Sequence, residues 1–266
     1  MDWVPEGVDT SRPNVARVYD YYLGGFHNFP ADREMAEAVI AAYPLTSAGV
    51  RANRHFLARA VQHLAADHGV RQFLDLGSGI PTEGNVHDIV QGIDPQARVV
   101  YVDVDPVAVA HSEAILAGNS RAAVVQADLR RPDDVLSAPA VTQLIDPTEP
   151  VAVLMMAVLH FVPDGDRPLE TIGHYREAFG PGSWLALTHA TDEFHPKKLH
   201  DEVADLYART PMPLTMRGRD QVLALLEGYE LVPPGLVLVE QWQPGVLADV
   251  EEPERFAGWA GVARAT

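Results

Sequence analysis

The sequence predicts an α/β fold with a doubly wound, mostly parallel sheet. Apolar segments of strand length alternate with amphipathic segments of helix length between residues 72 and 189, which is typical of repeated strand–helix–strand units. The first of these strands runs directly into a glycine turn, Gly77-Ser78-Gly79. Near the end of the chain two further strand segments have no helix between them, so we expect them to pair antiparallel at the end of the sheet.

The first 69 residues are expected to form a helical cap on residues 70–266, the two parts making one integrated unit. Pro13 is suited to the first turn of a helix, and apolar side chains then recur with helical spacing up to Tyr22. A second helix is expected over Ala31–Ala42, and a third begins with Ser47 as its cap and ends before Gly69.

The alternating region divides into five expected strands, with helices between them and after the last. Thr82 is a candidate cap for the first of these helices, and Pro139–Pro150 is expected to be a loop. The expected strands are Gln72–Leu76, Arg98–Val104, Ala122–Ala127, Val151–Ala157 and Ser183–His189, with Gly235–Trp242 and Phe256–Ala263 as the closing antiparallel pair. The expected helices are Thr82–Gln91, Pro106–Ala117, Asp133–Ser137, Arg167–Phe179, Lys197–Ala208 and Arg219–Leu226.

Composition narrows the classes of function. The 266 residues carry a formal net charge of −17, which opposes binding to nucleic acid and to anionic membranes. The absence of cysteine excludes disulfides, thiolate nucleophiles and cysteine-bound zinc, and fits a cytoplasmic protein. No secretory signal and no run of about 18 apolar residues is visible. No pair of histidines has helical metal-binding spacing, so we expect no metal.

The glycine turn after the first strand indicates a nucleotide-type ligand at the carboxyl edge of the sheet. A dinucleotide fingerprint needs a third glycine, which would fall on Thr82, and Asp75 would repel a pyrophosphate. A ligand with a cationic end reverses that argument, because a buried carboxylate beside the turn would attract it. S-adenosylmethionine (SAM), with its ammonium and sulfonium groups, is such a ligand.

Several segments resemble known proteins. Asp75-Leu76-Gly77-Ser78-Gly79 resembles the D/E-x-G-x-G motif of class I SAM-dependent methyltransferases, whose sheet is Rossmann-like. Over essentially its whole length, the chain resembles an actinobacterial S-adenosyl methyltransferase family that was formerly of unknown function. This second resemblance is carried by Arg12–Gly25, Asn28–Arg33, Arg51–Leu57 and Gln241–Pro244.

The resemblance implies further cofactor-binding residues. Asp103, with Val104 beside it, matches the acceptor of the ribose hydroxyls, while Asp105 is expected to cap the next helix. Asp128 matches the residue that binds the adenine amine, and the Leu129 amide would serve the ring. The alternative for Asp128 is that it caps the short helix that follows.

Met156 and Ala157 are expected to lie under the bound methionine. In the related family the helical arm covers the cofactor, and this implies that Tyr19, Tyr22, Asn28 and Arg33 line the lid. For each tyrosine, packing within the helix is an equal alternative.

The resulting hypothesis is a SAM-dependent methyltransferase acting on the oxygen or nitrogen of a small molecule. His160 is a candidate general base, with a backbone-bonded histidine as the alternative, and His189 is a candidate for the substrate pocket. No Asn/Asp-Pro-Pro-Tyr/Phe motif follows the fourth strand, which disfavours amino-methylation of nucleobases or glutamine. Two other functions stay open, namely a SAM-binding protein without transferase activity and, less favoured, an NAD(P)-dependent oxidoreductase. The oligomeric state is also open.

Overall fold

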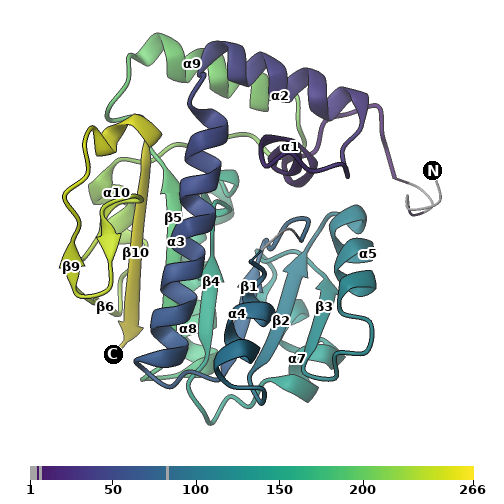
Figure 1. Cartoon of the computed structure of the whole chain (residues 1–266), viewed down its shortest axis with the longest axis vertical. Coiled ribbons are helices and arrows are strands. Elements are labelled where there is room, and N and C mark those ends of the chain that lie inside the picture. The colour runs from purple at the N-terminus through teal and green to yellow at the C-terminus, as the bar shows by residue number, and fades with distance from the viewer. Residues whose placement is uncertain (1–4, 6–7, 82–83) are drawn as a thin grey trace.

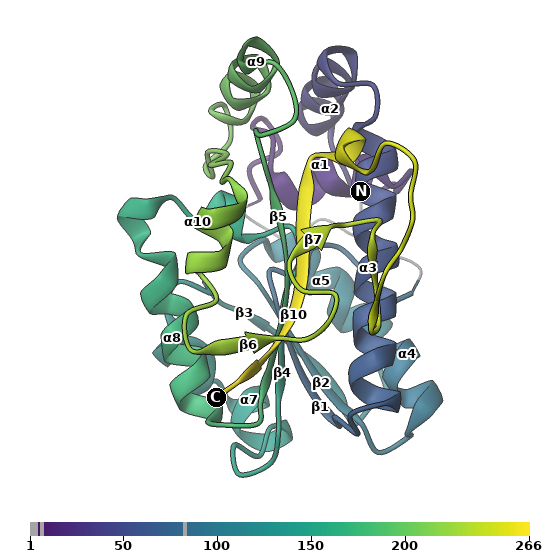
Figure 2. The same ribbon diagram turned by 90° about the vertical axis from the view of Figure 1, so that its left-hand side faces the viewer.

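The computed structural model describes residue 5 and residues 8–81 and 84–266. In this part of the chain, helices pack on both faces of an eight-stranded sheet (Figures 1 and 2). The strand order is β3-β2-β1-β4-β5-β10-β6, with β7 also paired to β10. The strands are β1 (Gln72–Leu76), β2 (Arg98–Asp103), β3 (Ala122–Gln126), β4 (Ala152–Met155), β5 (Trp184–Ala190), β6 (Tyr229–Leu231), β7 (Val237–Leu238) and β10 (Gly258–Ala265).

The predicted doubly wound sheet with an antiparallel C-terminal end is confirmed. Strands β1 to β5 pair in parallel, and β10 lies antiparallel to β5, β6 and β7. The ten α-helices of the described chain are α1 (Val15–Tyr22), α2 (Pro30–Ala42), α3 (Thr46–Ala66), α4 (Val86–Ile93), α5 (Pro106–Ile115), α6 (Pro132–Leu136), α7 (Pro139–Leu144), α8 (Pro168–Phe179), α9 (Lys197–Tyr207) and α10 (Arg219–Ala224).

Alternation along the strands divides the core between the two faces of the sheet. In β1, Phe73 packs with α3 and α4, while Leu74 and Leu76 pack on the opposite face with α8. Figure 2 shows these helices on either side of the sheet. Because side chains alternate, Asp75 points to the same face as Phe73, toward α3. The side chain of Asp75 therefore lies in the interior, beside the glycine turn, and it is the one carboxylate of β1.

A cap covers the carboxyl ends of the parallel strands. Helices α1, α2 and α9 share an apolar cluster of their own, which includes Val18, Val39 and Tyr207. Figure 1 shows α2 and α9 side by side above the strand ends. The cap does not coincide with the predicted division between residues 1–69 and residues 70–266. Helix α3 belongs to the first of these parts but packs on the sheet, whereas α9 belongs to the second part but packs in the cap.

Two predicted helix starts are wrong. Asn14 precedes α1, and its side chain accepts a hydrogen bond from the Ala16 amide at 2.8 Å, so the helix starts later than Pro13. Helix α3 starts at Thr46, which leaves Ser47 inside the first turn and not at the cap. The predicted cap Thr82 lies outside the described residues, and α4 spans Val86–Ile93.

The predicted loop Pro139–Pro150 is also wrong, because α7 begins with Pro139 at its first position and buries Val141.

The largest error concerns the strand predicted over Gly235–Trp242. Only Val237–Leu238 pair with β10 there, and Trp242–Gln243 instead form β8 of a small hairpin with β9 (Val246–Leu247). On the side of β10 that faces away from β5, most of the pairing is with β6, which has three residues with a glutamate in the middle. Such a short strand gives little alternation to recognise. No described helix is both long enough and apolar enough to cross a membrane.

Candidate functional site

The loop after β1 brings its backbone close to the loop after β4. Gly77 and Gly79 have positive φ angles of 72° and 67°, which favour glycine. The amides of Gly77 and Ser78 both donate to the Val102 carbonyl of β2. A Cβ atom on Gly77 would lie 2.3 Å from Cγ2 of Val158, whereas one on Gly79 would meet no atom within 4 Å. Gly77 is therefore required by close packing as well as by its φ angle.

Asp103, at the end of β2, faces this turn. Its Oδ2 atom accepts a hydrogen bond from the Gly79 amide at 2.7 Å, and its Oδ1 atom accepts one from the Asp105 amide at 2.9 Å. Asp105 in turn caps α5, since its Oδ1 atom accepts from the Val107 amide at 2.7 Å. The prediction that Asp105 caps the helix after β2 is confirmed.

Two buried carboxylates of the site, those of Asp75 and Asp103, have pKa values well above the ordinary value for aspartate. Asp75 is 5% exposed and Asp103 is 7% exposed. Burial raises the pKa of Asp75 to about 7, despite the opposing positive charge of Arg54. Burial likewise raises the pKa of Asp103 to about 6, against the hydrogen bonds from the backbone. Both groups would be stabilised in their ionised form by a ligand that brings positive charge or hydrogen-bond donors.

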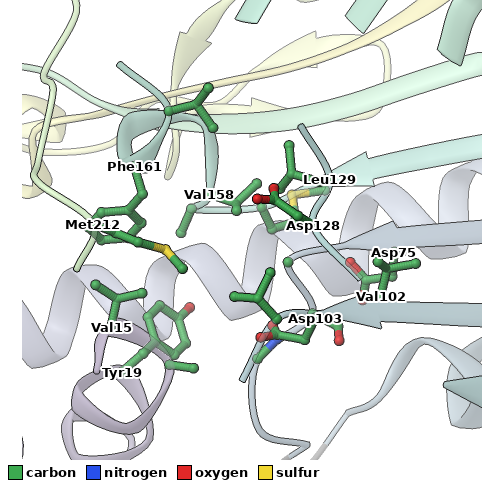
Figure 3. A pocket seen from close by; sticks show the side chains of 18 of the residues that line it. Val15, Tyr19, Asp75, Val102, Asp103, Asp128, Leu129, Val158, Phe161 and Met212 are labelled. Atoms are coloured by element: carbon green, nitrogen blue, oxygen red, sulfur yellow. The ribbon is translucent and has the colours of Figure 1, made fainter. Parts of the chain in front are cut away.

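A first cavity opens over this turn. Figure 3 shows Asp103 and Asp128 on one side of it and Tyr19, Phe161 and Met212 on the other. The residues predicted to bind the cofactor that line this cavity are Tyr19, Asp75, Gly77, Ser78, Gly79, Asp103, Val104, Asp128, Leu129, Met156 and Ala157.

Asp128 is held in place by an arginine that the sequence analysis did not single out. Burial raises its pKa, but hydrogen bonds from Arg130 outweigh that effect and leave the pKa lowered, so the carboxylate is ionised. The Arg130 guanidinium donates to both Asp128 oxygens and also pairs with Asp166 at 2.6 Å. The helix-cap alternative for Asp128 is wrong, since the residue before α6 is Arg131, whose side chain makes no cap hydrogen bond.

A second cavity lies under the cap. It is bounded by α2 and α9 above and by the ends of β4, β5 and the start of β10 below. The two cavities meet at a neck, a set of residues that line both of them: Val15, Tyr19, Asn53, Ala157 and Phe161. The two cavities therefore lie next to each other, on either side of these five residues.

A chain of hydrogen bonds fixes the neck. The Asn53 amide donates to the Tyr19 hydroxyl at 2.8 Å, and the Thr188 hydroxyl donates to the Asn53 side-chain oxygen at 2.6 Å. The Thr188 hydroxyl also accepts from the Ala157 amide at 2.8 Å. These bonds connect α1 and α3 to β5 and to the loop after β4, so the cap and the sheet are joined at the neck. Ala157 has a positive φ of 52°, an uncommon backbone state of the kind found at functional sites.

His160 and His189 line the second cavity and are both held neutral. Burial lowers the pKa of His160 well below its usual value, and burial lowers that of His189 to about 4. His160 accepts a hydrogen bond from the Ala190 amide through Nδ1, so its proton is on Nε2. His189 donates through Nδ1 to the Ala190 carbonyl and accepts from the buried Arg217 through Nε2. His160 can therefore donate a hydrogen bond to a ligand, whereas both ring nitrogens of His189 are already engaged.

Three predicted lid residues lie elsewhere than in the first cavity. Tyr22 lines the second cavity, with its hydroxyl 3.3 Å from that of Tyr207. Asn28 and Arg33 are not among the residues that line either cavity. The Asn28 side chain donates to Asp20, and Arg33 donates to the Asn28 carbonyl at 2.8 Å, so both hold the turn between α1 and α2.

Asn53 and Arg54 are the main site residues that sequence analysis missed. Asn53 is three residues from Val50 and from Phe56, so it is a polar residue on the apolar face of α3. A polar residue on the apolar face of a helix is a signal for a site residue that the sequence contains. The segment Arg51–Leu57 was singled out only because it resembles the related family. Arg54 lies in the first cavity and its charge acts on Asp75.

The first cavity fits a ligand with a cationic end and hydroxyl groups. It offers two buried carboxylates with raised pKa values, a glycine turn that allows close approach, and the buried Ser78 hydroxyl, for which the described residues provide no hydrogen-bond partner. Among the described residues, no group of three or more His, Asp or Glu side chains is arranged to hold a metal ion.

Comparison with known proteins agrees with this fit. The model of a family described as S-adenosyl methyltransferase matches residues 1–266. A DUF574 family protein from Streptomyces avermitilis is 40% identical, with a TM-score of 0.91 over 97% of this chain and 99% of its own. A protein from Thermobifida fusca is 37% identical, with a TM-score of 0.92 over the full length of both chains. A search of curated proteins finds no match.

More distant structures share only the fold. The N-methyltransferase NodS from Bradyrhizobium japonicum, in complex with S-adenosylhomocysteine, is 13% identical, with a TM-score of 0.52 over 94% of this chain and 98% of its own. The fold and the site together define a class I SAM-dependent methyltransferase. The chain belongs to the S-adenosyl methyltransferase family, and its cofactor is SAM. The nicotinamide alternative is thereby set aside.

Proposed function

We propose that this enzyme methylates a small organic molecule that binds in the second cavity, while SAM occupies the first. The observation that carries the proposal is the neck, where Tyr19, Asn53 and Ala157 line both cavities. A transferred group must pass directly from donor to acceptor, so the two sites must meet. The cap supports a small acceptor, because α2 and α9 lie over the second cavity.

The residues of the first cavity have complementary roles toward SAM in this proposal. Asp75 would attract the cationic methionine end, and Asp103 would accept hydrogen bonds from the ribose hydroxyls. Asp128 and the Leu129 amide would bind the adenine, as the family resemblance implies. SAM supplies a methyl group activated by its sulfonium. The chain itself would orient the two molecules and exclude water from the neck.

The role we propose for His160 differs from that of a general base. Its Nδ1 atom accepts from the Ala190 amide, so the remaining nitrogen, Nε2, carries the proton. Its lowered pKa keeps the ring neutral. In this state His160 would donate a hydrogen bond that orients the acceptor. Catalysis would then rest on positioning and desolvation of the acceptor at the neck. The acceptor's oxygen or nitrogen would bond to the methyl group as the methyl–sulfur bond breaks, S-adenosylhomocysteine would leave as the neutral product, and the acceptor's proton would pass to water on product release.

The test is transfer of radiolabel from SAM to cell extract separated by molecular size. We expect label in the small-metabolite fraction with the wild-type enzyme. The variant Val203→Trp should abolish it by filling the second cavity, while SAM binding by calorimetry is retained. Glu202→Trp, at an exposed position of the same helix, is the matched control and should retain transfer.

Label confined to RNA, DNA or protein would contradict the small-molecule proposal. Absence of label from every fraction, with SAM binding intact, would favour a SAM-binding protein without transferase activity.

A further inference from the structure

Building on the proposed function, we propose that the acceptor is an uncharged aromatic molecule. The inference concerns the second cavity alone and rests on the chemistry of its lining. Three features carry it: the absence of charged side chains from the described lining, the neutral state of its buried histidines, and the number of aromatic rings around the space.

The two cavities differ sharply in charge. The first is lined by three aspartates and two arginines. Among the described residues that line the second, there is no Asp, Glu, Lys or Arg. A buried carboxylate or ammonium without a partner is strongly unfavourable. The free-energy cost of desolvating a charged acceptor would therefore exceed the free energy that its contacts with this lining supply. The chain as a whole carries a net charge of −17, so the neutral lining is a local property of this cavity.

Three of the four histidines that line the second cavity do not supply the missing charge, and the fourth, His195, has its Nε2 atom 2.9 Å from the Tyr43 hydroxyl. His160 and His189 have lowered pKa values and hydrogen bonds that fix them as neutral rings. Burial also lowers the pKa of His200, on α9. At neutral pH these three rings are therefore uncharged. They offer an anionic acceptor no cation.

Aromatic side chains surround the space from both the cap and the sheet side. Phe161 and Tyr207 lie with ring centroids 5.6 Å apart, and the hydroxyls of Tyr22 and Tyr207 are 3.3 Å apart. Rings favour flat ligands through stacked and edge-to-face contacts. A few polar groups among many apolar ones are typical of pockets that bind small organic molecules. The lining aromatic residues are Tyr19, Tyr22, Tyr43, Phe161, Tyr207 and Phe256.

Three probes of matched size test this inference: 2-naphthol, 2-naphthoate and 2-naphthylmethylammonium. Their binding is measured by calorimetry at neutral pH, with the first cavity saturated by S-adenosylhomocysteine. We expect 2-naphthol to bind at least about tenfold more tightly than either ion. Val203→Trp should remove its binding, and Glu202→Trp should not.

A second pair of variants tests the charge argument directly. Leu199→Lys places an ammonium in the lining and should raise the affinity for 2-naphthoate, whereas Leu199→Met should leave the order of the three probes unchanged. Equal or tighter binding of either ion to the wild type would overturn the inference. So would a failure of all three probes to bind, or 2-naphthol binding that survives Val203→Trp. These results do not depend on methyl transfer, so they are separate from the outcome of the extract assay.

Discussion

The two cavities under the cap are neighbours with opposite electrostatics. The first holds Asp75 and Asp103, whose burial raises their pKa values to about 7 and about 6. The second lies under the same cap, and the described residues that line it include no Asp, Glu, Lys or Arg. Burying a carboxylate costs free energy that a bound cation can offset. Charge is thus placed where the cofactor's own charge would compensate it, and is kept away from the space proposed for the acceptor.

The cap is common to both cavities, so loosening it should produce the largest effect. Arg17 is buried between Asp32 at 3.0 Å and Asp105 at 3.9 Å, and so joins α1 and α2 to the start of α5. Arg17→Met leaves two buried carboxylates without this partner. We expect a loss of about 3–5 kcal/mol in the free energy of unfolding, together with weaker binding in both cavities.

Urea denaturation measures the effect, and Arg33→Met, in the same cap, is the milder control. If Arg17→Met weakened binding in one cavity only, the cap would not be shared.

Gly77→Ala should distinguish the two cavities, because it should weaken binding in the first cavity only. The new methyl group would meet Val158 at 2.3 Å, in a backbone state that already disfavours alanine. We expect SAM binding to weaken by about 2–4 kcal/mol. Gly79→Ala shares the positive φ but meets no neighbour, so its loss should be smaller. Calorimetry with SAM compares the two, and equal losses would show that the φ angle alone matters.

The first cavity was largely predictable from sequence, whereas only separate residues of the second, such as His160 and His189, were predicted. Gly77, Asp75 and Asp103 lie at the ends of two neighbouring parallel strands, so their spacing along the chain already places them together. The second cavity is assembled from α2, α9, β5 and β10, which are far apart in sequence and share no motif.

The strength of the local sequence signal also explains why some predictions for single residues and short elements were right and others were wrong. Asp105 was identified as a cap because an Asp before a proline-initiated helix is a local signal, whereas β6 has only three residues and gave none. Asn28 and Arg33 were assigned to the lid by resemblance, which does not reveal that their hydrogen bonds serve a turn.

The ribose hypothesis predicts an intermediate effect. Asp103→Ala leaves the Gly79 and Asp105 amides without their acceptor and should weaken SAM binding by about 1–3 kcal/mol. Asp105→Ala removes a helix cap, so it should cost stability by about 1 kcal/mol and affect binding less. Neither should change 2-naphthol binding. A reversed order for SAM would assign the ribose contact to Asp105.

The last prediction concerns pH, where the effect within one pH unit is the smallest of the four. The pKa of Asp75 is about 7 when folded, against 3.8 ordinarily, so between those values the folded state binds a proton that the unfolded state has lost. The ligand-free protein should therefore lose stability as pH rises through this window, and SAM affinity should rise by up to about tenfold per pH unit. Asp75→Asn should remove this part of both trends. Thermal denaturation and calorimetry across pH measure them, and an unchanged pH profile in the variant would exclude Asp75 as the cause.

The central claim is that donor and acceptor meet at the neck. A crystal structure of the enzyme with S-adenosylhomocysteine and 2-naphthol tests it most directly. The account predicts the thioether sulfur beside Tyr19, Asn53 and Ala157, with the naphthol ring in the second cavity and its oxygen directed toward the sulfur. A sulfur atom directed away from the neck, or a cofactor product that occupies the second cavity, would contradict it.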